Sequence, residues 1–158
     1  YGGTTSYNHF SIGTNRGRKL IEDLCNNAFI IKASQDDQRY LMPDMEIEEC
    51  LEYLVSRGPA HAVVTMGSRG AAYLSRGKKT VFSGSFPTME SQEKNLTGAG
   101  DAFSAGLIVS MDEDKEDIER AVRYANSMAS LILEEKGGCV ETRMPIDRMV
   151  RLRMEGKL

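Results

Sequence analysis

The chain has 158 residues, of which 41% are hydrophobic and 27% are charged, a composition typical of one globular domain rather than of a disordered segment. The formal net charge of −3 provides no basic surface for nucleic acid, and no apolar run approaches the roughly 20 residues that a membrane-spanning helix needs. Cys25, Cys50 and Cys139 are widely spaced and form no metal-binding motif. Such cysteines are typical of reduced thiols, so we expect a cytoplasmic protein. From the net charge and the lack of a long apolar run we expect neither nucleic-acid nor membrane partners.

The first third of the chain alternates polar and apolar segments. Residues 1–17 contain four glycines and are expected to be loop-like. Apolar residues at helical spacing predict a helix over about 17–26, and the run at 28–31 predicts a buried strand. A second stripe predicts an amphipathic helix that ends near Gly58-Pro59; it consists of Ile47, Cys50, Leu51, Leu54 and Val55. The apolar run at 62–66 predicts another buried strand, and the three elements together predict a strand–helix–strand unit.

The remaining elements follow without an internal repeat or a linker. Strands at 71–75 and 79–83 flank Arg76-Gly77-Lys78, which predicts a hairpin. A helix over about 98–111 is apolar on most faces and is therefore expected to be deeply buried. Further helices are predicted over 115–135 and 145–155, the last opening with Pro145, a residue favoured in the first turn. We expect a single α/β domain over residues 1–158.

Residues 95–103 carry the most informative motif, Asn-Leu-Thr-Gly-Ala-Gly-Asp-Ala-Phe. Gly98, Ala99 and Gly100 are small, so backbone N–H groups can approach a ligand closely. The start of a helix adds unpaired N–H groups and a partial positive charge, which favour an anion. Asp101 therefore places a carboxylate beside an anion-binding turn. This combination suggests phosphoryl transfer rather than simple phosphate binding.

The run Thr-Gly-Ala-Gly-Asp-Ala-Phe, followed by Ser104-Ala105-Gly106, closely resembles the C-terminal signature of the ribokinase-like (phosphofructokinase B) carbohydrate and nucleoside kinases. The resemblance implies that Asp101 is the catalytic base that accepts the proton of a substrate hydroxyl. It also implies that the backbone of residues 98–100 forms the anion hole for the phosphoryl group. ATP and Mg²⁺ are the implied cofactors, and a small sugar or nucleoside is the implied acceptor.

A second segment, Val63 to Ala71, places glycines directly after a predicted strand. Taken alone, Gly67 and Gly70 fit a tight turn with positive φ about as well as a ligand-binding loop. The segment is also similar to the family's Thr-x-Gly-x-x-Gly nucleotide segment. By that resemblance Thr65, Gly67 and Gly70 lie along the phosphates and ribose of ATP.

Two weaker resemblances concern polar residues on other elements. Ser34 and Asp37 occupy the place of the family's Asn-x-x-Glu, whose glutamate orders magnesium through water; an acidic helix start favoured by the helix dipole explains Asp37 about as well. Asn126 resembles the asparagine of the helix near the adenine. It falls on or beside an apolar stripe, so it needs a polar partner, and a hydrogen bond within the core is the alternative.

The residues before the main motif bear on a monovalent cation. Most ribokinase-like relatives carry an aspartate where this chain has Asn95. In the ribokinase branch that acid and the threonine two residues later, Thr97 here, help to form a monovalent-cation site. The loss of the negative charge at Asn95 weakens the expectation of potassium activation.

The resemblance spans about residues 28–140 and concerns the C-terminal half of the family. It implies the C-terminal half of a Rossmann-type three-layer α/β/α fold, without the N-terminal half and lid that carry acceptor specificity. The leading function is an ATP-dependent phosphotransferase acting on a hydroxyl of a sugar or similar small molecule. The alternative is a non-catalytic nucleotide-binding module or an inactive fragment of such a kinase. A sheet cut at its middle would expose a strand edge, so we expect self-association.

Overall fold

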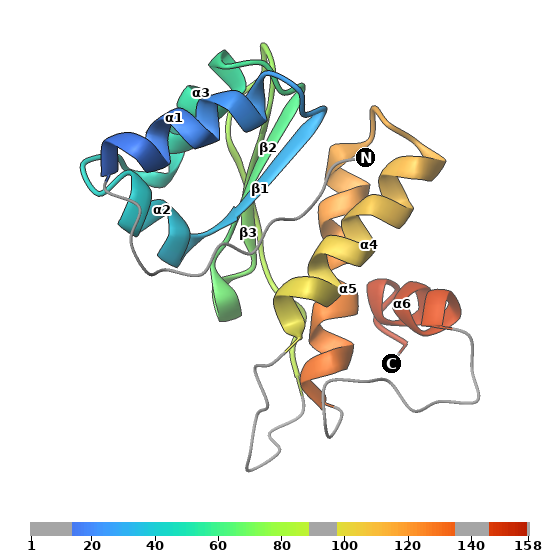
Figure 1. The fold of residues 1–158 in the computed structure, drawn as a ribbon. Coiled ribbons are helices and arrows are strands. Elements are labelled where there is room, and N and C mark those ends of the chain that lie inside the picture. Colours follow the sequence, from blue (N-terminus) through green and yellow to red (C-terminus); the bar gives the residue numbers. More distant parts are fainter. Residues whose placement is uncertain (1–13, 89–97, 135–145, 158) are drawn as a thin grey trace. The chain divides into compact units, whose positions relative to one another are not determined.

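The computed structural model describes residues 14–88, 98–134 and 146–157, which form two compact units (Figure 1). The first unit contains the described residues up to Met66 together with Ala71–Phe82. The second contains Gly67–Gly70 and the described residues from Ser83 onward. The expected single domain over residues 1–158 stays a prediction.

The described strands form one sheet in the order β1-β2-β3-β4. They are β1 (Ile30–Ser34), β2 (His61–Thr65), β3 (Ala71–Ser75) and β4 (Val81–Ser83). β1 and β2 are parallel, whereas β2 and β3 are antiparallel. The strand–helix–strand prediction is therefore confirmed, and β3 and β4 are neighbours as the hairpin requires. β1 lies about three residues later than predicted, because it is a half-buried edge strand that accommodates polar residues beyond the apolar run.

Three helices pack together with this sheet: α1 (Thr14–Cys25), α2 (Gln35–Leu41) and α3 (Ile47–Ser56). The predicted loop over 1–17 is wrong for residues 14–17, which belong to α1. Helix propagation explains the difference, since each added residue contributes one backbone hydrogen bond once the helix is nucleated. α3 matches the predicted amphipathic stripe, and all five apolar residues of that stripe are buried.

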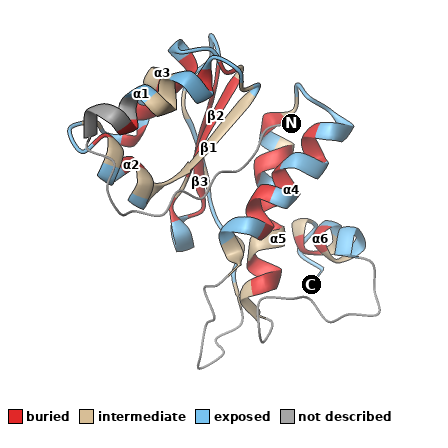
Figure 2. Ribbon diagram, viewed as in Figure 1, coloured by how far each residue is buried: buried red, intermediate tan, exposed pale blue. Residues whose placement is uncertain are grey.

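The core of the first unit lies between these helices and the sheet, and β2 is its most buried strand (Figure 2). Ala62, Val63 and Val64 have no exposed surface. Ala62 and Val64 belong to a core cluster with residues of α1, α3 and β3 and with Met42, which follows α2; its members include Cys25, Met42, Cys50, Leu51, Leu54, Ala72 and Leu74. Strands with apolar residues on both faces are typical of parallel pairing.

The second unit consists mainly of α4 (Ala99–Glu113), α5 (Ile118–Glu134) and α6 (Ile146–Met154). α5 packs against both α4 and α6. Gly106 permits the close approach of α4 and α5, because a Cβ at this position would lie only 3.0 Å from the Cα of Ala125. Within the described part of the chain, every helix is too short or too polar to cross a membrane.

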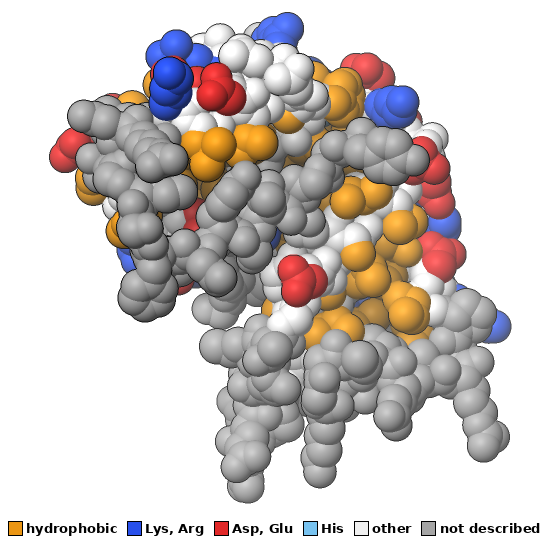
Figure 3. Space-filling model, viewed as in Figure 1, with side chains coloured by type: hydrophobic (Ala, Val, Ile, Leu, Met, Phe, Trp, Pro, Cys, Tyr) orange, Lys and Arg blue, Asp and Glu red, His pale blue; other side chains and the backbone are white. Residues whose placement is uncertain are grey.

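One face of α4 departs from the expected deep burial. Phe103 and Leu107 are buried, but Ile108 is 52% exposed and Val109 is 48% exposed. Figure 3 shows hydrophobic side chains along this helix at the surface. The prediction of a fully buried helix is wrong for this face, because an apolar composition specifies what a helix can bury but not how many neighbours it has.

Candidate active site

The first turn of α4 carries the predicted anion-binding motif. Gly98 precedes the helix with φ +87° and ψ −11°, a left-handed conformation that favours glycine. The first intrahelical bond runs from the N–H of Ala102 to the carbonyl of Gly98 at 2.8 Å. The N–H groups of Ala99, Gly100 and Asp101 precede that bond and have no acceptor within the helix. The turn therefore presents three N–H donors and the positive end of the helix dipole to one region.

Asp101 lies in that same first turn and is exposed to solvent. Its carboxylate is thus accessible beside the N–H donors rather than engaged in the core. Ser104 stabilises the next turn by donating its hydroxyl to the carbonyl of Gly100 at 2.9 Å. An exposed acid next to an anion-binding turn can accept a proton from a hydroxyl that approaches a bound phosphoryl group.

Gly67 begins the short 3₁₀ turn Gly67–Arg69 and Gly70 follows it; both glycines have positive φ, at +60° and +87°. The N–H of Gly70 donates to the carbonyl of Gly67 at 3.0 Å. Gly67 is exposed, and nothing lies within 4 Å of the position that a Cβ would take. Gly70 is buried, and a Cβ there would lie 2.6 Å from the carbonyl carbon of Gly84. The two glycines thus have different tasks: Gly67 keeps the loop open, whereas Gly70 allows close packing.

The segment Ser83–Ser85, which the sequence did not single out, packs against this loop. The hydroxyl of Ser85 donates to the carbonyl of Ser68 at 2.5 Å. From α5, Asn126 donates its side-chain amide to the carbonyl of Gly84 at 3.3 Å and to the hydroxyl of Ser83 at 3.4 Å. Asn126 is only 5% exposed, and its polar partners lie in this half-buried to exposed segment; its place near the adenine stays a prediction. In the sequence, the small residues Ser83-Gly84-Ser85 are the local feature that could have pointed to this segment.

Ser34 and Thr65 lie side by side at the carboxyl ends of the parallel strands β1 and β2, where their Cα positions are paired. Ligands of open α/β sheets bind beyond such strand ends. Ser34 also begins α2 in a capping box, because the N–H of Asp37 donates to its hydroxyl oxygen at 3.0 Å. In return the hydroxyl of Ser34 donates to Oδ2 of Asp37 at 2.6 Å. Ser34 is therefore the N-cap of α2, and Asp37 is its partner in the capping box.

The capping role leaves Asp37 with one carboxylate oxygen, Oδ1, that accepts no hydrogen bond from the described residues. A single such oxygen fits magnesium held through water, because Mg²⁺ keeps several waters and is bound mainly by phosphates. No cluster of three or more His, Cys, Asp or Glu side chains that could hold a metal by itself occurs in the described ranges. The predicted cation-site residues Asn95 and Thr97 lie outside the described residues.

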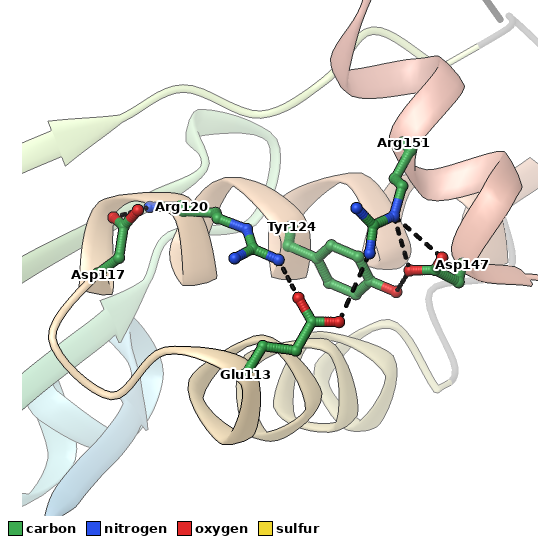
Figure 4. A network of polar contacts seen from close by, with 6 residues as sticks. All are labelled: Glu113, Asp117, Arg120, Tyr124, Asp147 and Arg151. Atoms are coloured by element: carbon green, nitrogen blue, oxygen red, sulfur yellow. Dashed lines mark hydrogen bonds and ion pairs between the residues drawn. The ribbon is translucent and has the colours of Figure 1, made fainter.

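A polar network ties the three helices of the second unit together (Figure 4). Glu113, at the end of α4, forms ion pairs with Arg120 of α5 and Arg151 of α6. Arg151 also bonds Asp147 at 3.0 Å, and this hydrogen bond lowers the pKa of the Asp147 carboxyl. The hydroxyl of Tyr124 donates to Asp147 at 3.0 Å. Burial, and then this bond, raises the pKa of Tyr124 to about 12.

A second polar contact between α5 and α6 is buried. Arg153 of α6 is 7% exposed and forms an ion pair with Glu134 of α5 at 2.5 Å. It also donates to the hydroxyl of Ser130 at 2.9 Å. A buried arginine needs such partners, since an unpaired buried charge is costly. Together with the network around Tyr124, this pair fixes α6 against α5, the helix that carries Asn126.

Comparison with known proteins gives these features a context. Residues 11–144 match the sequence model described as "pfkB family carbohydrate kinase". The ribokinase of Bacillus subtilis (strain 168) is 33% identical over 135 residues, which are 84% of this chain and 43% of that protein. Fructokinase-1 of Oryza sativa subsp. japonica is 28% identical over 127 residues, covering 76% of this chain and 38% of that protein.

A solved structure shows the same relation. The ribokinase of Arabidopsis thaliana, determined in complex with ribose and ATP, superposes with a TM-score of 0.68 and 25% sequence identity. The match covers 85% of this chain and 43% of the ribokinase. The α/β arrangement described above is therefore a ribokinase-like fold, and the chain spans less than half the length of these relatives.

Proposed function

Because this chain belongs to the pfkB family of carbohydrate kinases, we propose that it carries the nucleotide-binding and catalytic part of an ATP-dependent sugar kinase. The observation that carries the proposal is the first turn of α4, where an exposed Asp101 adjoins three N–H groups without intrahelical acceptors. Relatives named as ribokinase and fructokinase support a sugar hydroxyl as the acceptor. The relative solved with ribose and ATP supports ATP as the donor.

In the proposed reaction, a sugar hydroxyl oxygen attacks the γ-phosphorus of ATP. The bond between that phosphorus and the bridging oxygen breaks, ADP leaves, and the hydroxyl proton passes to the carboxylate of Asp101. Phosphoryl transfer has a loose transition state, so the main tasks are positioning and charge stabilisation. The N–H groups of Ala99, Gly100 and Asp101 would serve the second task, and one such donor contributes about 3–4 kcal/mol in other anion holes.

The candidate nucleotide-binding residues lie at strand ends and in the loop that follows β2. Ser34 and Thr65 are paired at strand ends, and Gly67 leaves an open approach to the loop that follows. Asp37 would hold magnesium through water by its Oδ1 atom. When bound, magnesium neutralises charge on the phosphates.

The test is Asp101→Asn in a form of the protein that phosphorylates a sugar. We expect turnover to fall at least ~100-fold, because the general base is lost, while ATP affinity stays unchanged. Asp112→Asn is the matched control, since Asp112 is an exposed carboxylate on the same helix, and it should retain full turnover. Wild-type turnover from Asp101→Asn would rule out the assignment.

The competing function is a nucleotide-binding module without phosphotransferase activity. A panel of pentoses, hexoses and nucleosides, assayed with labelled ATP, separates the two. Transfer of label to any hydroxyl acceptor supports the kinase, whereas saturable ATP binding without transfer to any acceptor supports the module.

Self-association and a cytoplasmic location stay predictions. The surface expected to pair is the edge of β1, the outermost strand among the described residues, beside which Phe29 is 47% exposed. Sedimentation velocity at micromolar concentration tests this: dimers support the prediction, and a clean monomer contradicts it.

A further inference from the structure

We propose that Asn126 is a positioning residue for the nucleotide loop Gly67–Gly70, and that it acts through the backbone segment Ser83–Ser85. The inference rests on the proposed function, since it assigns the loop to nucleotide binding. It concerns how the loop is held rather than what the loop contacts. All residues involved belong to the second unit.

The first step is the backbone contact between the loop Gly67–Gly70 and the segment Ser83–Ser85. A Cβ at Gly70 would lie 2.6 Å from the carbonyl carbon of Gly84 and 2.7 Å from the nitrogen of Ser85. The two backbones are thus in direct contact, with no side chain between them. Any shift of Gly84 therefore moves Gly70 as well, because atoms already in contact cannot absorb a displacement.

The second step is the polar tie that holds the exposed half of the loop. Ser85 donates its hydroxyl to the carbonyl of Ser68 at 2.5 Å. Ser68 lies between Gly67 and Gly70, and glycine has no side chain that could anchor the loop. The loop is therefore held to the segment at Ser68 and at Gly70, while Gly67 stays open.

The third step is the support beneath the segment. Asn126 donates its amide to the carbonyl of Gly84 at 3.3 Å and to the hydroxyl of Ser83 at 3.4 Å. Asn126 is only 5% exposed, whereas Ser83 is half-buried and Gly84 is exposed, so the two bonds are partly shielded from water. Gly84 is thus contacted by the loop through Gly70 and by α5 through Asn126.

The fourth step links the support to the catalytic helix. Ala125, the neighbour of Asn126, packs against Gly106 of α4, with only 3.0 Å between its Cα and the position of a Cβ at Gly106. α4 begins with the anion-binding turn. A continuous set of contacts therefore joins the catalytic helix, Asn126, Gly84 and the nucleotide loop. In this arrangement Asn126 sets the position of the loop without touching the nucleotide.

The chain offers a close control in the adjacent residue. Ser127 is fully buried on the same helix and donates its hydroxyl to a backbone carbonyl, that of Val150 in α6, at 3.2 Å. Ser127→Ala removes a buried hydrogen bond of the same kind, directed away from the loop. Asn126→Asp keeps the shape of the side chain but replaces its donor with an acceptor facing the carbonyl of Gly84.

The experiment measures backbone hydrogen exchange of the ligand-free chain and the ADP dissociation constant for wild type, Asn126→Asp and Ser127→Ala. We expect Asn126→Asp to accelerate exchange at residues 68–70 and 84–85 and to weaken ADP binding, each about tenfold. Ser127→Ala should change neither by more than about twofold. Ser85→Ala, at an exposed position, should reproduce the accelerated exchange at 68–70 even where Asn126→Asp does not fold.

Equal exchange at residues 68–70 in wild type and in folded Asn126→Asp, or in wild type and Ser85→Ala, would overturn the inference. So would a Ser127→Ala variant that matches Asn126→Asp in both measurements, because the effect would then reflect general stability. Wild-type chain that binds no ADP contradicts the proposed function instead, and the exchange comparison of the ligand-free variants still decides the positioning role.

Discussion

The contrast between Gly67 and Gly70 yields the sharpest prediction for the candidate site. Both residues have positive φ, so alanine at either position costs about 1–2 kcal/mol in backbone strain. At Gly67 nothing lies within 4 Å of the new Cβ, and the strain is the whole cost. At Gly70 the Cβ would lie 2.6 and 2.7 Å from backbone atoms of Gly84 and Ser85. Carbon atoms in contact are normally about 3.5–4.0 Å apart, so that segment must move by roughly 1 Å.

Such forced displacement in a packed region typically costs a further 1–3 kcal/mol. We therefore expect Gly67→Ala to lower the free energy of unfolding by about 1–2 kcal/mol, and Gly70→Ala by about 2–5 kcal/mol. Urea unfolding followed by far-ultraviolet circular dichroism suits the measurement, since the chain contains no Trp. The reasoning is refuted if the two variants lose the same stability within about 0.5 kcal/mol, because the close backbone approach at Gly70 would then not exist.

Three further predictions concern the rest of the molecule. Tyr124→Phe should lower the free energy of unfolding by about 1 kcal/mol at neutral pH, through loss of the bond to Asp147. The raised pKa of Tyr124, about 12, means that its stabilising contribution is complete below about pH 10 and is lost as pH rises toward 12. The difference in stability between wild type and variant should therefore be largest below about pH 10 and shrink as pH approaches 12, and a difference that stays constant would contradict this account. Gly106→Ala should lower thermal stability measured by circular dichroism, because its Cβ meets backbone of the facing helix at 3.0 Å, and a gain in stability would contradict that packing. Burial raises the pKa values of Cys25 and Cys50 to about 11. In a Cys139→Ser variant, a thiol reagent at neutral pH should therefore react with these two thiols only as fast as the chain opens. Rapid reaction in the native chain would argue against this burial.

The sequence predicted those parts of the fold that depend on local patterns. The stripe from Ile47 to Val55 became α3 with the expected residues buried. The strand–helix–strand unit was confirmed as a parallel pair, and the motif at 98–101 does open a helix with glycine in a left-handed conformation. Periodicity and turn chemistry act over a few residues, which is why they can be read without tertiary information.

The parts that were missed depend on contacts between distant residues. Nothing near Gly70 indicates that it packs against Gly84, fourteen positions along the chain, and nothing near Asn126 identifies a partner more than forty residues away. The exposed face of α4 was missed for a related reason, since Ile108 and Val109 are apolar regardless of whether a neighbour covers them. Asp37 was interpreted as a magnesium residue or as an acidic helix start favoured by the helix dipole, and its capping-box bonds to Ser34 are compatible with both roles.

A calorimetric titration of the folded chain with MgATP tests the central claim most directly. We expect saturable binding at submillimolar to millimolar nucleotide that is weakened by Gly67→Ala and unchanged by Asp101→Asn, because the glycine keeps the loop open whereas the aspartate acts on the acceptor hydroxyl. Absence of binding at millimolar MgATP, in a chain that circular dichroism shows to be folded, would contradict the assignment of this chain as the nucleotide-binding part of a carbohydrate kinase.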